Sequence, residues 1–196
     1  MTTHVETSPL SLHGQETCLP TLETLIRDHY SYIQRLALTI LDDGSPDAAV
    51  NAQAEAEDAA QDTFLAASRA LPDFRGNASL KTWLTTIAVN QCRARLRKRK
   101  THRRLQKLIS NQQSAIKNNP PSPEDSTLES DTHRHLWAAV DSLDEKHRLP
   151  VLMRYVHELP IPEIAAALGL PEGTVHSRLH HARARLQARL TEETHE

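Results

Sequence analysis

Hydrophobic residues recur at helical spacing in several separate stretches of the chain. The first stretch begins near Thr21 and stops at 42–46, where two aspartates, a glycine, a serine and a proline follow one another. A second helix is predicted from about Ala56 to Ala70, and the acidic, Ala-rich stretch 47–57 before it is compatible with a loop or a weak helix. A third helix opens near Ser79, whose hydroxyl is placed to cap it.

The pattern fades over residues 101–132, and three prolines within 118–123 exclude a helix there. Helical spacing returns near His133. The sequence therefore predicts an all-α fold of two small helical domains joined by a flexible linker. The expected divisions are a disordered leader at 1–20, a first domain at 21–100, the linker at 101–132, a second domain at 133–190 and a tail at 191–196.

The composition indicates the cellular compartment and argues against membrane-spanning, secreted and disulfide-rich proteins. Aromatic residues make up 4% of the 196 residues, and no apolar run reaches membrane-spanning length. The first twenty residues are polar and contain acids, which is unlike a signal peptide, so we expect a cytoplasmic protein. Cys18 and Cys92 are isolated and form no CxxC motif, which indicates neither a zinc ribbon nor a disulfide framework.

Charge is strongly segregated along the chain, although the net charge is only −2. The stretch 74–123 holds twelve lysines and arginines and no acid, while the other 11 basic residues share the rest of the chain with all 25 acids. This segregation of charge predicts one surface that binds a polyanion and a different surface that binds another kind of partner.

The segment 161–186 predicts a helix-turn-helix. A short helix at 162–168 ends at Gly169, which takes the positive φ of a sharp turn. The next helix buries Val175, Leu179, Ala182 and Leu186, and no acid occurs between Gly173 and Thr191. Its opposite face suits the major groove of DNA. That face carries Thr174, His176, Ser177, Arg178, His180, His181, Arg183 and Arg185. A plain helical hairpin with a solvated basic face is the alternative.

A metal site is not indicated by the histidines of this helix. His176 and His180 stand four residues apart, but no glutamate lies between them in an HExxH arrangement. No nucleophile with a base, no phosphate loop and no carboxylate cluster in a basic groove is present either. We therefore expect no metal, no cofactor and no enzymatic activity.

The third predicted helix combines two kinds of nucleic-acid chemistry. Eight basic residues fall within 93–104, a density typical of contacts with a phosphate backbone, although a solvated helix end is the alternative. Upstream, the segment 79–84 mixes hydroxyls, a lysine and an aromatic ring, a surface that can stack on and hydrogen-bond an unpaired base. For Trp83 a core position is an equally good interpretation.

The second predicted helix has the opposite chemistry. The segment 57–64 presents carboxylates and an amide beside a phenylalanine, with no basic residue until Arg69. This face repels DNA, so as a functional surface it is expected to bind protein; a solvated acidic face is the alternative.

Taken together, these motifs resemble the extracytoplasmic-function (ECF) sigma factors of bacterial RNA polymerase. The segments that carry the resemblance are 56–65, 74–90 and 159–179, in that order and separated by a linker. The similar regions cover about 21–100 and 133–190. The resemblance implies a protein that binds core polymerase, directs it to specific promoters and promotes strand opening.

The resemblance also implies a role for each surface. In the family, region 2 docks on the clamp of the largest polymerase subunit and captures a flipped base of the −10 element, and region 4 binds the −35 element. The clamp contact falls on Asp58, Gln61, Asp62 and Phe64. The −10 contact falls on Asn77, Ser79, Lys81, Thr82, Trp83, Asn90, Arg93 and Arg97. The −35 contact falls on Thr174, His176, Ser177, Arg178, His180, His181 and Arg183.

Two features depart from the family pattern. The stretch 42–55 is longer than the usual connection between the first two helices, and the leader of about twenty residues is extra. Family members are commonly held by an anti-sigma factor, so one is expected as a partner here.

The runner-up interpretation is a conventional helix-turn-helix regulator that binds duplex DNA as a dimer without polymerase. The acidic face and the second, separate basic region argue against it. A nucleic-acid enzyme is a third and weakly supported interpretation.

Overall fold

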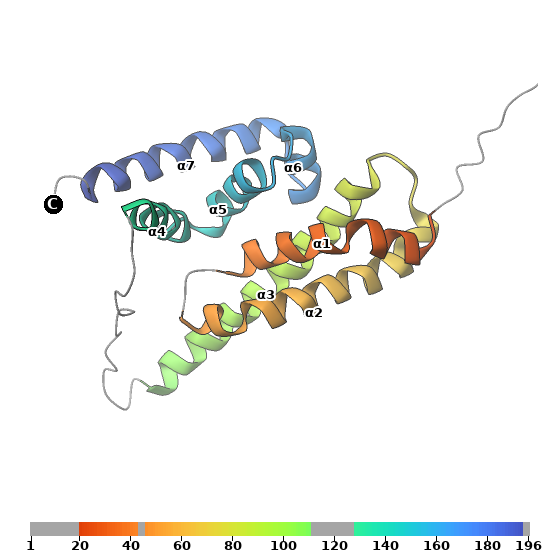
Figure 1. The fold of residues 1–196 in the computed structure, drawn as a ribbon, viewed down its shortest axis with the longest axis horizontal. Coiled ribbons are helices and arrows are strands. Elements are labelled where there is room, and N and C mark those ends of the chain that lie inside the picture. Colours follow the sequence, from red (N-terminus) through yellow and green to blue (C-terminus); the bar gives the residue numbers. More distant parts are fainter. Residues whose placement is uncertain (1–19, 43–45, 111–127, 194–196) are drawn as a thin grey trace, which may run out of the picture.

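The computed structural model describes residues 20–42, 46–110 and 128–193, and every regular element within these ranges is helical (Figure 1). The all-α prediction is confirmed. The elements are α1 (Leu22–Leu41), α2 (Pro46–Ala70), η1 (Leu71–Asp73), α3 (Leu80–Ser110), α4 (Leu128–Asp141), α5 (Glu145–Val151), η2 (Leu152–Val156), α6 (Ile161–Leu168) and α7 (Glu172–Glu193). No helix in the described part of the chain is both long and apolar enough to cross a membrane.

Helices α1, α2 and α3 pack against one another, and we call them the N-terminal bundle (Figure 1). Thr21 caps α1 by accepting a hydrogen bond from the Thr24 amide at 3.3 Å. The helix then buries a stripe at 3.6-residue spacing that includes Ile33, Leu36 and Ile40, all fully buried.

Helix α2 begins at Pro46, about ten residues before the start that the hydrophobic pattern suggested. The stretch 47–57 is therefore helical and continuous with the rest of α2. Alanine has the highest helix propensity, and proline is well accommodated in a first turn. Ala52 and Ala56 are buried, so the extra turns of the longer connection pack like the rest of the helix.

Helix α3 begins where the sequence predicted and continues further. The Ser79 hydroxyl accepts a hydrogen bond from the Thr82 amide at 3.0 Å, which confirms the predicted cap. The helix runs to Ser110, ten residues past the expected end of the first domain, because arginine, lysine, leucine and glutamine all favour helix. The proline-rich segment 118–123 and residues 1–19 of the leader lie outside the described residues.

Helices α4 to α7 form a second group, the C-terminal bundle. Pro150 lies inside α5, and the five residues that follow the end of α5 wind as a π-helical turn. Helices α6 and α7 are joined at Gly169, whose φ of 64° is left-handed. The Leu170 amide donates to the Ala165 carbonyl at 2.9 Å and so closes the end of α6.

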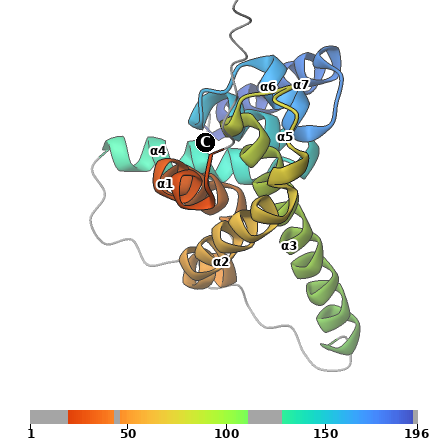
Figure 2. The same ribbon diagram turned by 90° about the vertical axis from the view of Figure 1, so that its right-hand side faces the viewer.

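The two bundles lie directly against each other (Figures 1 and 2). Helix α6 packs on α3, and one continuous cluster of buried side chains draws on both bundles. The cluster includes Cys92, which is fully buried; burial raises the pKa of its thiol to about 12. The sequence had not predicted this contact between the bundles.

His157 lies at the boundary between the bundles, directly after η2. Its ring meets Tyr32 of α1 edge-on, with centroids 6.1 Å apart, and its Nε2 atom is buried without a hydrogen-bond partner among the described residues. Burial, together with the positive charges of Arg35 and Lys81, lowers the pKa of His157 to about 4.

This environment predicts acid sensitivity. In the unfolded chain a histidine titrates near its ordinary pKa of about 6.5, whereas folded His157 stays neutral down to about pH 4. Between these values the unfolded state binds more protons, so stability is expected to fall as pH drops below about 6.5. Thermal unfolding midpoints measured from neutral pH to about pH 4.5 will test this. His157→Phe keeps an aromatic ring against Tyr32 and is expected to flatten the slope, whereas His176→Phe, at an exposed position, is expected to keep it. Equal slopes in all three proteins would contradict the assignment.

Candidate nucleic-acid and protein interfaces

The helix-turn-helix predicted from the sequence is formed by α6, Gly169 and α7. Val175, Leu179 and Ala182 are buried to 2% exposure or less, and Leu186 is partly buried, as predicted. Because these positions fix the rotation of α7, His176 and Ser177 point to solvent near its amino end. The Ser177 hydroxyl donates to the Thr174 carbonyl at 3.0 Å, and its lone pairs remain available to a ligand.

The other predicted residues of α7 lie in different surroundings. Arg183 lies against Tyr155, with its Nε atom 2.5 Å from the tyrosine hydroxyl and its guanidinium 5.7 Å from the ring centre. The ring of exposed His181 lies between those of His180 and buried His147. Contacts within the C-terminal bundle thus orient the carboxyl half of the predicted reading face, although its side chains are exposed. In the amino half His176 and Ser177 are exposed, and Thr174 and Arg178 are partly buried.

The predicted base-capturing residues at and near the start of α3 fall into two groups, one accessible to solvent and one buried. Asn77, Lys81 and Asn90 are exposed. Trp83 is half-buried and packs on Phe74, with ring centres 5.1 Å apart, so part of the residue remains accessible.

Thr82 belongs to the other group. It is 4% exposed, and its hydroxyl lies 2.7 Å from the exposed Ser79 hydroxyl inside the helix cap. The hydroxyl therefore stabilises the start of α3 and does not face solvent, which corrects its assignment as a base contact.

Several arginines in the basic run of α3 are held in ion pairs, so fewer of its cations are available to phosphates than the density of the run suggested. Arg95 pairs with Asp62 at 2.5 Å, and Arg99 pairs with Glu55 at 2.5 Å and donates to the Leu41 carbonyl at 2.7 Å. Arg93 pairs with Glu145 of α5 at 2.9 Å. The exposed cations of this run include Arg97, Lys98 and Lys100, and they are the ones best placed to meet phosphates.

Helix α2 presents the predicted acidic face. Asp58, Gln61 and Asp62 are exposed along one side of the helix. Phe64 is not on that side: it is 4% exposed and stacks on Tyr30 of α1, with ring centres 6.0 Å apart. Its assignment as a partner contact is corrected, because its ring holds α1 and α2 together.

Leu65 is the apolar residue that the sequence analysis missed on this face. Its side chain is 54% exposed, and it follows Asp58 and Gln61 at i+7 and i+4. That helical spacing is the feature of the sequence that could have predicted Leu65 on this face. We call Asp58, Gln61, Asp62 and Leu65 the acidic–apolar stripe.

A second candidate protein-binding surface lies on the C-terminal bundle, and the sequence pattern did not predict it. An apolar groove of about 870 Å³ runs between α4, η2 and α7. Leu136, Tyr155 and Val156 are 43%, 51% and 43% exposed along it, which is unusual for large apolar side chains clustered on one surface. The helical spacing of Leu136 and Val140 does not distinguish a core position from a groove, and only the arrangement of the helices shows that both residues line one.

Comparison with known proteins gives matches to both bundles. The family model described as Sigma-70 region 2 matches residues 25–102, and the model described as Sigma-70, region 4 matches residues 133–186. The chain is 31% identical over 141 residues to the ECF RNA polymerase sigma factor SigW of Bacillus subtilis, covering 69% of this chain and 75% of that protein. It is 32% identical over 171 residues to SigM of Mycobacterium tuberculosis, covering 84% and 74%.

Solved structures share the fold. The sigma factor RpoE of Bartonella quintana, in complex with the anti-sigma factor NepR, aligns with a TM-score of 0.59 at 23% identity, covering 86% of this chain and 96% of that chain. CnrH, in complex with the cytosolic domain of CnrY, aligns with a TM-score of 0.57 at 24% identity, covering 87% and 88%.

The neighbouring positions 64 and 65 give a direct test of the burial pattern. Phe64→Ala removes a buried ring and is expected to lower the free energy of unfolding by about 3–5 kcal/mol. Leu65→Ala removes an exposed side chain and is expected to change it by less than about 0.5 kcal/mol. Urea unfolding followed by circular dichroism measures both values, and similar losses in the two variants would show that the helix is rotated from the orientation described.

Proposed function

The chain belongs to the ECF sigma factors of bacterial RNA polymerase, and from this premise we propose how its surfaces divide the work of initiation. As a sigma factor it is a promoter-specific initiation factor that binds the polymerase core, and it is neither an enzyme nor a conventional regulator acting alone. The observation that carries the proposal is the placement, on separate bundles of one chain, of an acidic–apolar stripe and of a helix-turn-helix whose second helix has no acid from Gly173 to Thr191.

The N-terminal bundle is assigned to region 2 and the C-terminal bundle to region 4, with boundaries near 21–100 and 133–190. The acidic–apolar stripe of α2 docks on the clamp of the largest polymerase subunit. Carboxylates around an exposed leucine suit a basic protein surface with an apolar centre. The same carboxylates keep this side of α2 away from DNA.

Recognition of the −10 element is assigned to the amino end of α3. Asn77, Lys81, Trp83 and Asn90 are the side chains placed to hold an unpaired base, with Ser79 at the rim and Arg97 on the backbone. A stacked base contributes about 1–3 kcal/mol, which offsets part of the cost of opening the duplex. Binding of the polymerase at a second, upstream element supplies more of that free energy.

Helix α7 takes the −35 element in the major groove through its amino half. His176, Ser177 and Arg178 are the side chains assigned to base edges, with Thr174 beside them. His180, His181 and Arg183 lie further along the helix, where contacts with phosphates are the expected role.

The apolar groove of the C-terminal bundle is assigned to a helix of a protein partner. Its exposed leucine, valine and tyrosine suit the apolar face of an amphipathic helix. Core polymerase and an anti-sigma factor are the two partners we propose; the RpoE and CnrH structures were solved with NepR and CnrY bound. We place the protein in the cytoplasm, where RNA polymerase acts.

A mixing experiment tests the function as a whole. The purified chain is combined with sigma-free bacterial core polymerase, and co-elution and transcripts from a genomic library are measured. Co-elution with new, discrete start sites is the expected result. Absence of co-elution, together with binding of duplex DNA by the chain alone, would favour the conventional regulator instead.

Two double variants test the division of labour. Asp58→Arg with Leu65→Ala is expected to weaken core binding roughly tenfold or more, because it reverses a charge and removes the apolar centre of the stripe, while binding of the −35 duplex is retained. His176→Ala with Ser177→Ala is expected to weaken −35 duplex binding by about tenfold and to spare core binding. Fluorescence anisotropy with labelled core and labelled duplex measures both. Loss of the same activity in both folded variants would refute the assignment.

A further inference from the structure

Tyr32 of α1 contacts the side chain of Lys81 directly and the main chain of Lys81 through Thr85. The Lys81 ammonium lies over the face of the tyrosine ring, with its Nζ atom 4.5 Å from the ring centre. A cation in this position is attracted by the negative face of the ring. The Tyr32 hydroxyl lies 3.3 Å from the Thr85 hydroxyl, which donates to the Lys81 carbonyl at 2.8 Å.

The direction of these hydrogen bonds follows from the hydrogens available. Thr85 is 1% exposed, and its hydroxyl has a single hydrogen, which it donates to the Lys81 carbonyl. The Thr85 oxygen therefore accepts from Tyr32, so the tyrosine is the donor and must be protonated. Burial raises the pKa of Tyr32, which keeps its hydroxyl protonated at neutral pH.

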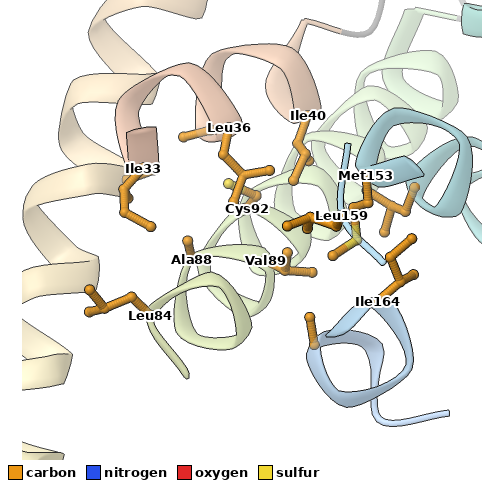
Figure 3. Close-up of a cluster of buried hydrophobic side chains, with 14 of the residues drawn as sticks. Ile33, Leu36, Ile40, Leu84, Ala88, Val89, Cys92, Met153, Leu159 and Ile164 are labelled. Atoms are coloured by element: carbon orange, nitrogen blue, oxygen red, sulfur yellow. The ribbon is translucent and has the colours of Figure 1, made fainter. Parts of the chain in front are cut away.

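The packing of α1 on α3 fixes the position of the tyrosine ring. Ile33, which follows Tyr32, is fully buried and belongs to the same cluster as Leu84 and Ala88 of α3. Figure 3 shows the Ile33 side chain pointing from α1 toward these two residues. Tyr32 itself is partly buried, whereas Lys81 is exposed and has the longer, more flexible side chain. The tyrosine is thus the fixed member of the pair.

These contacts belong to the N-terminal bundle alone, although the C-terminal bundle also touches α1. Arg148 of α5 is 6% exposed and donates to carbonyls at the carboxyl end of α1, those of Thr39, Ile40 and Asp42. The ring of His157 meets that of Tyr32. Lys81 and Thr85 both lie on α3, so the contacts that Tyr32 makes with them do not require the C-terminal bundle.

Lys81 is an unfavourable residue for the start of α3 considered alone. It lies in the first turn, where the helix dipole disfavours a cation, and that turn contains no acid. A free lysine side chain also loses rotamer freedom when a ligand orders it. Contact with Tyr32 reduces both penalties before a ligand arrives, because the ring attracts the cation and the side chain is already ordered.

We propose that Tyr32 is a positioning residue for recognition of the −10 element, which holds the Lys81 ammonium in place before the unpaired strand is captured. Ser79 and Trp83, assigned to the same element, lie within two residues of Lys81. Tyr32 acts through Lys81 and touches no DNA itself. The inference rests on the proposed function, which assigns Lys81 to the −10 element, and it extends the site to a residue of α1.

Strand binding by the assembled holoenzyme tests this role. The probe is a fluorescein-labelled non-template strand from a start site recovered in the mixing experiment, and anisotropy measures its affinity. Tyr32→Leu removes the ring and is expected to weaken strand binding about two- to fivefold, as for an exposed cation–π contact. Tyr32→Phe keeps the ring face and is expected to stay within about twofold. Core binding, measured separately, is expected to stay unchanged in both variants.

A double-mutant cycle separates positioning from general support of the fold. Lys81→Met keeps an unbranched side chain and removes the ammonium. Because Tyr32 acts through Lys81, Tyr32→Leu is expected to add little to the loss that Lys81→Met already causes, whereas a structural role makes the two losses multiply. Tyr30→Leu is the matched control: it removes a ring of the same helix that stacks on Phe64, and it is expected to leave strand binding unchanged.

Graded changes to the ring keep the role testable if Tyr32→Leu does not fold. Phenylalanine with no fluorine, or with one, two or three fluorine atoms, is incorporated at position 32. Fluorine withdraws electron density from the ring face and so weakens its attraction for a cation, with little change in ring size. Strand affinity is expected to fall stepwise, by about two- to fivefold in total, and to stay level across the series in Lys81→Met.

Multiplying losses in the cycle, or equal affinities across the fluorinated series, would overturn the role of Tyr32. Loss of core binding in a folded Tyr32→Leu variant would also contradict it, because the effect would then not be confined to the strand. Failure of the unsubstituted chain to bind core, or of its holoenzyme to bind the strand, is a different result. It would count against the proposed function, and the role of Tyr32 would fall with it.

Discussion

Burial of both faces of α3 is the constraint on which the rest of the structure depends. One face packs on α1 and α2, and another receives α6, so a single helix carries the core of the N-terminal bundle and the contact between bundles. Only its remaining surface is left for function. That surface is divided between the cap at Ser79, the accessible part of Trp83 and the exposed part of the basic run. Any ligand of α3 must therefore approach along a narrow strip or displace the C-terminal bundle.

Electrostatics inside the chain shapes both candidate interfaces. The sequence separates acids from bases, yet folding brings several of them together: Asp62 meets Arg95, and Glu55 meets Arg99. These pairs are partly exposed, so each contributes little to stability. Their larger effect is to orient the arginines of α3 along α2 and to leave Asp58 and Gln61 as the acids and amides directed at a partner. The extra turns at the start of α2 have a structural role here, because they supply Glu55.

Local features were predictable from the sequence, and features that depend on neighbours were not. Ser79 acts through its hydroxyl on an amide three residues away, and Gly169 acts through its own backbone, so the cap of α3 and the turn of the helix-turn-helix follow from residue type and spacing. Phe64 and Leu65 are adjacent on α2, and only the position of α1 decides which one is buried. Thr82 carries a hydroxyl of the kind that can bind a base, but its position places that hydroxyl in the cap of α3. The apolar groove and the contact between bundles arise from helices far apart in sequence, which no local pattern encodes.

Recognition of main-chain atoms by Arg148 has an evolutionary consequence. The guanidinium meets the carbonyls of residues 39, 40 and 42 and touches none of their distinguishing side-chain groups through these hydrogen bonds. Every amino acid supplies the same carbonyl, so those positions are free to drift while the contact persists. Comparison of related sequences would then show no covariation across this contact, and the arginine would stand out only as a charged residue retained at a buried position. Contacts of this kind can be identified in a structure, but they leave no covariation in a sequence alignment.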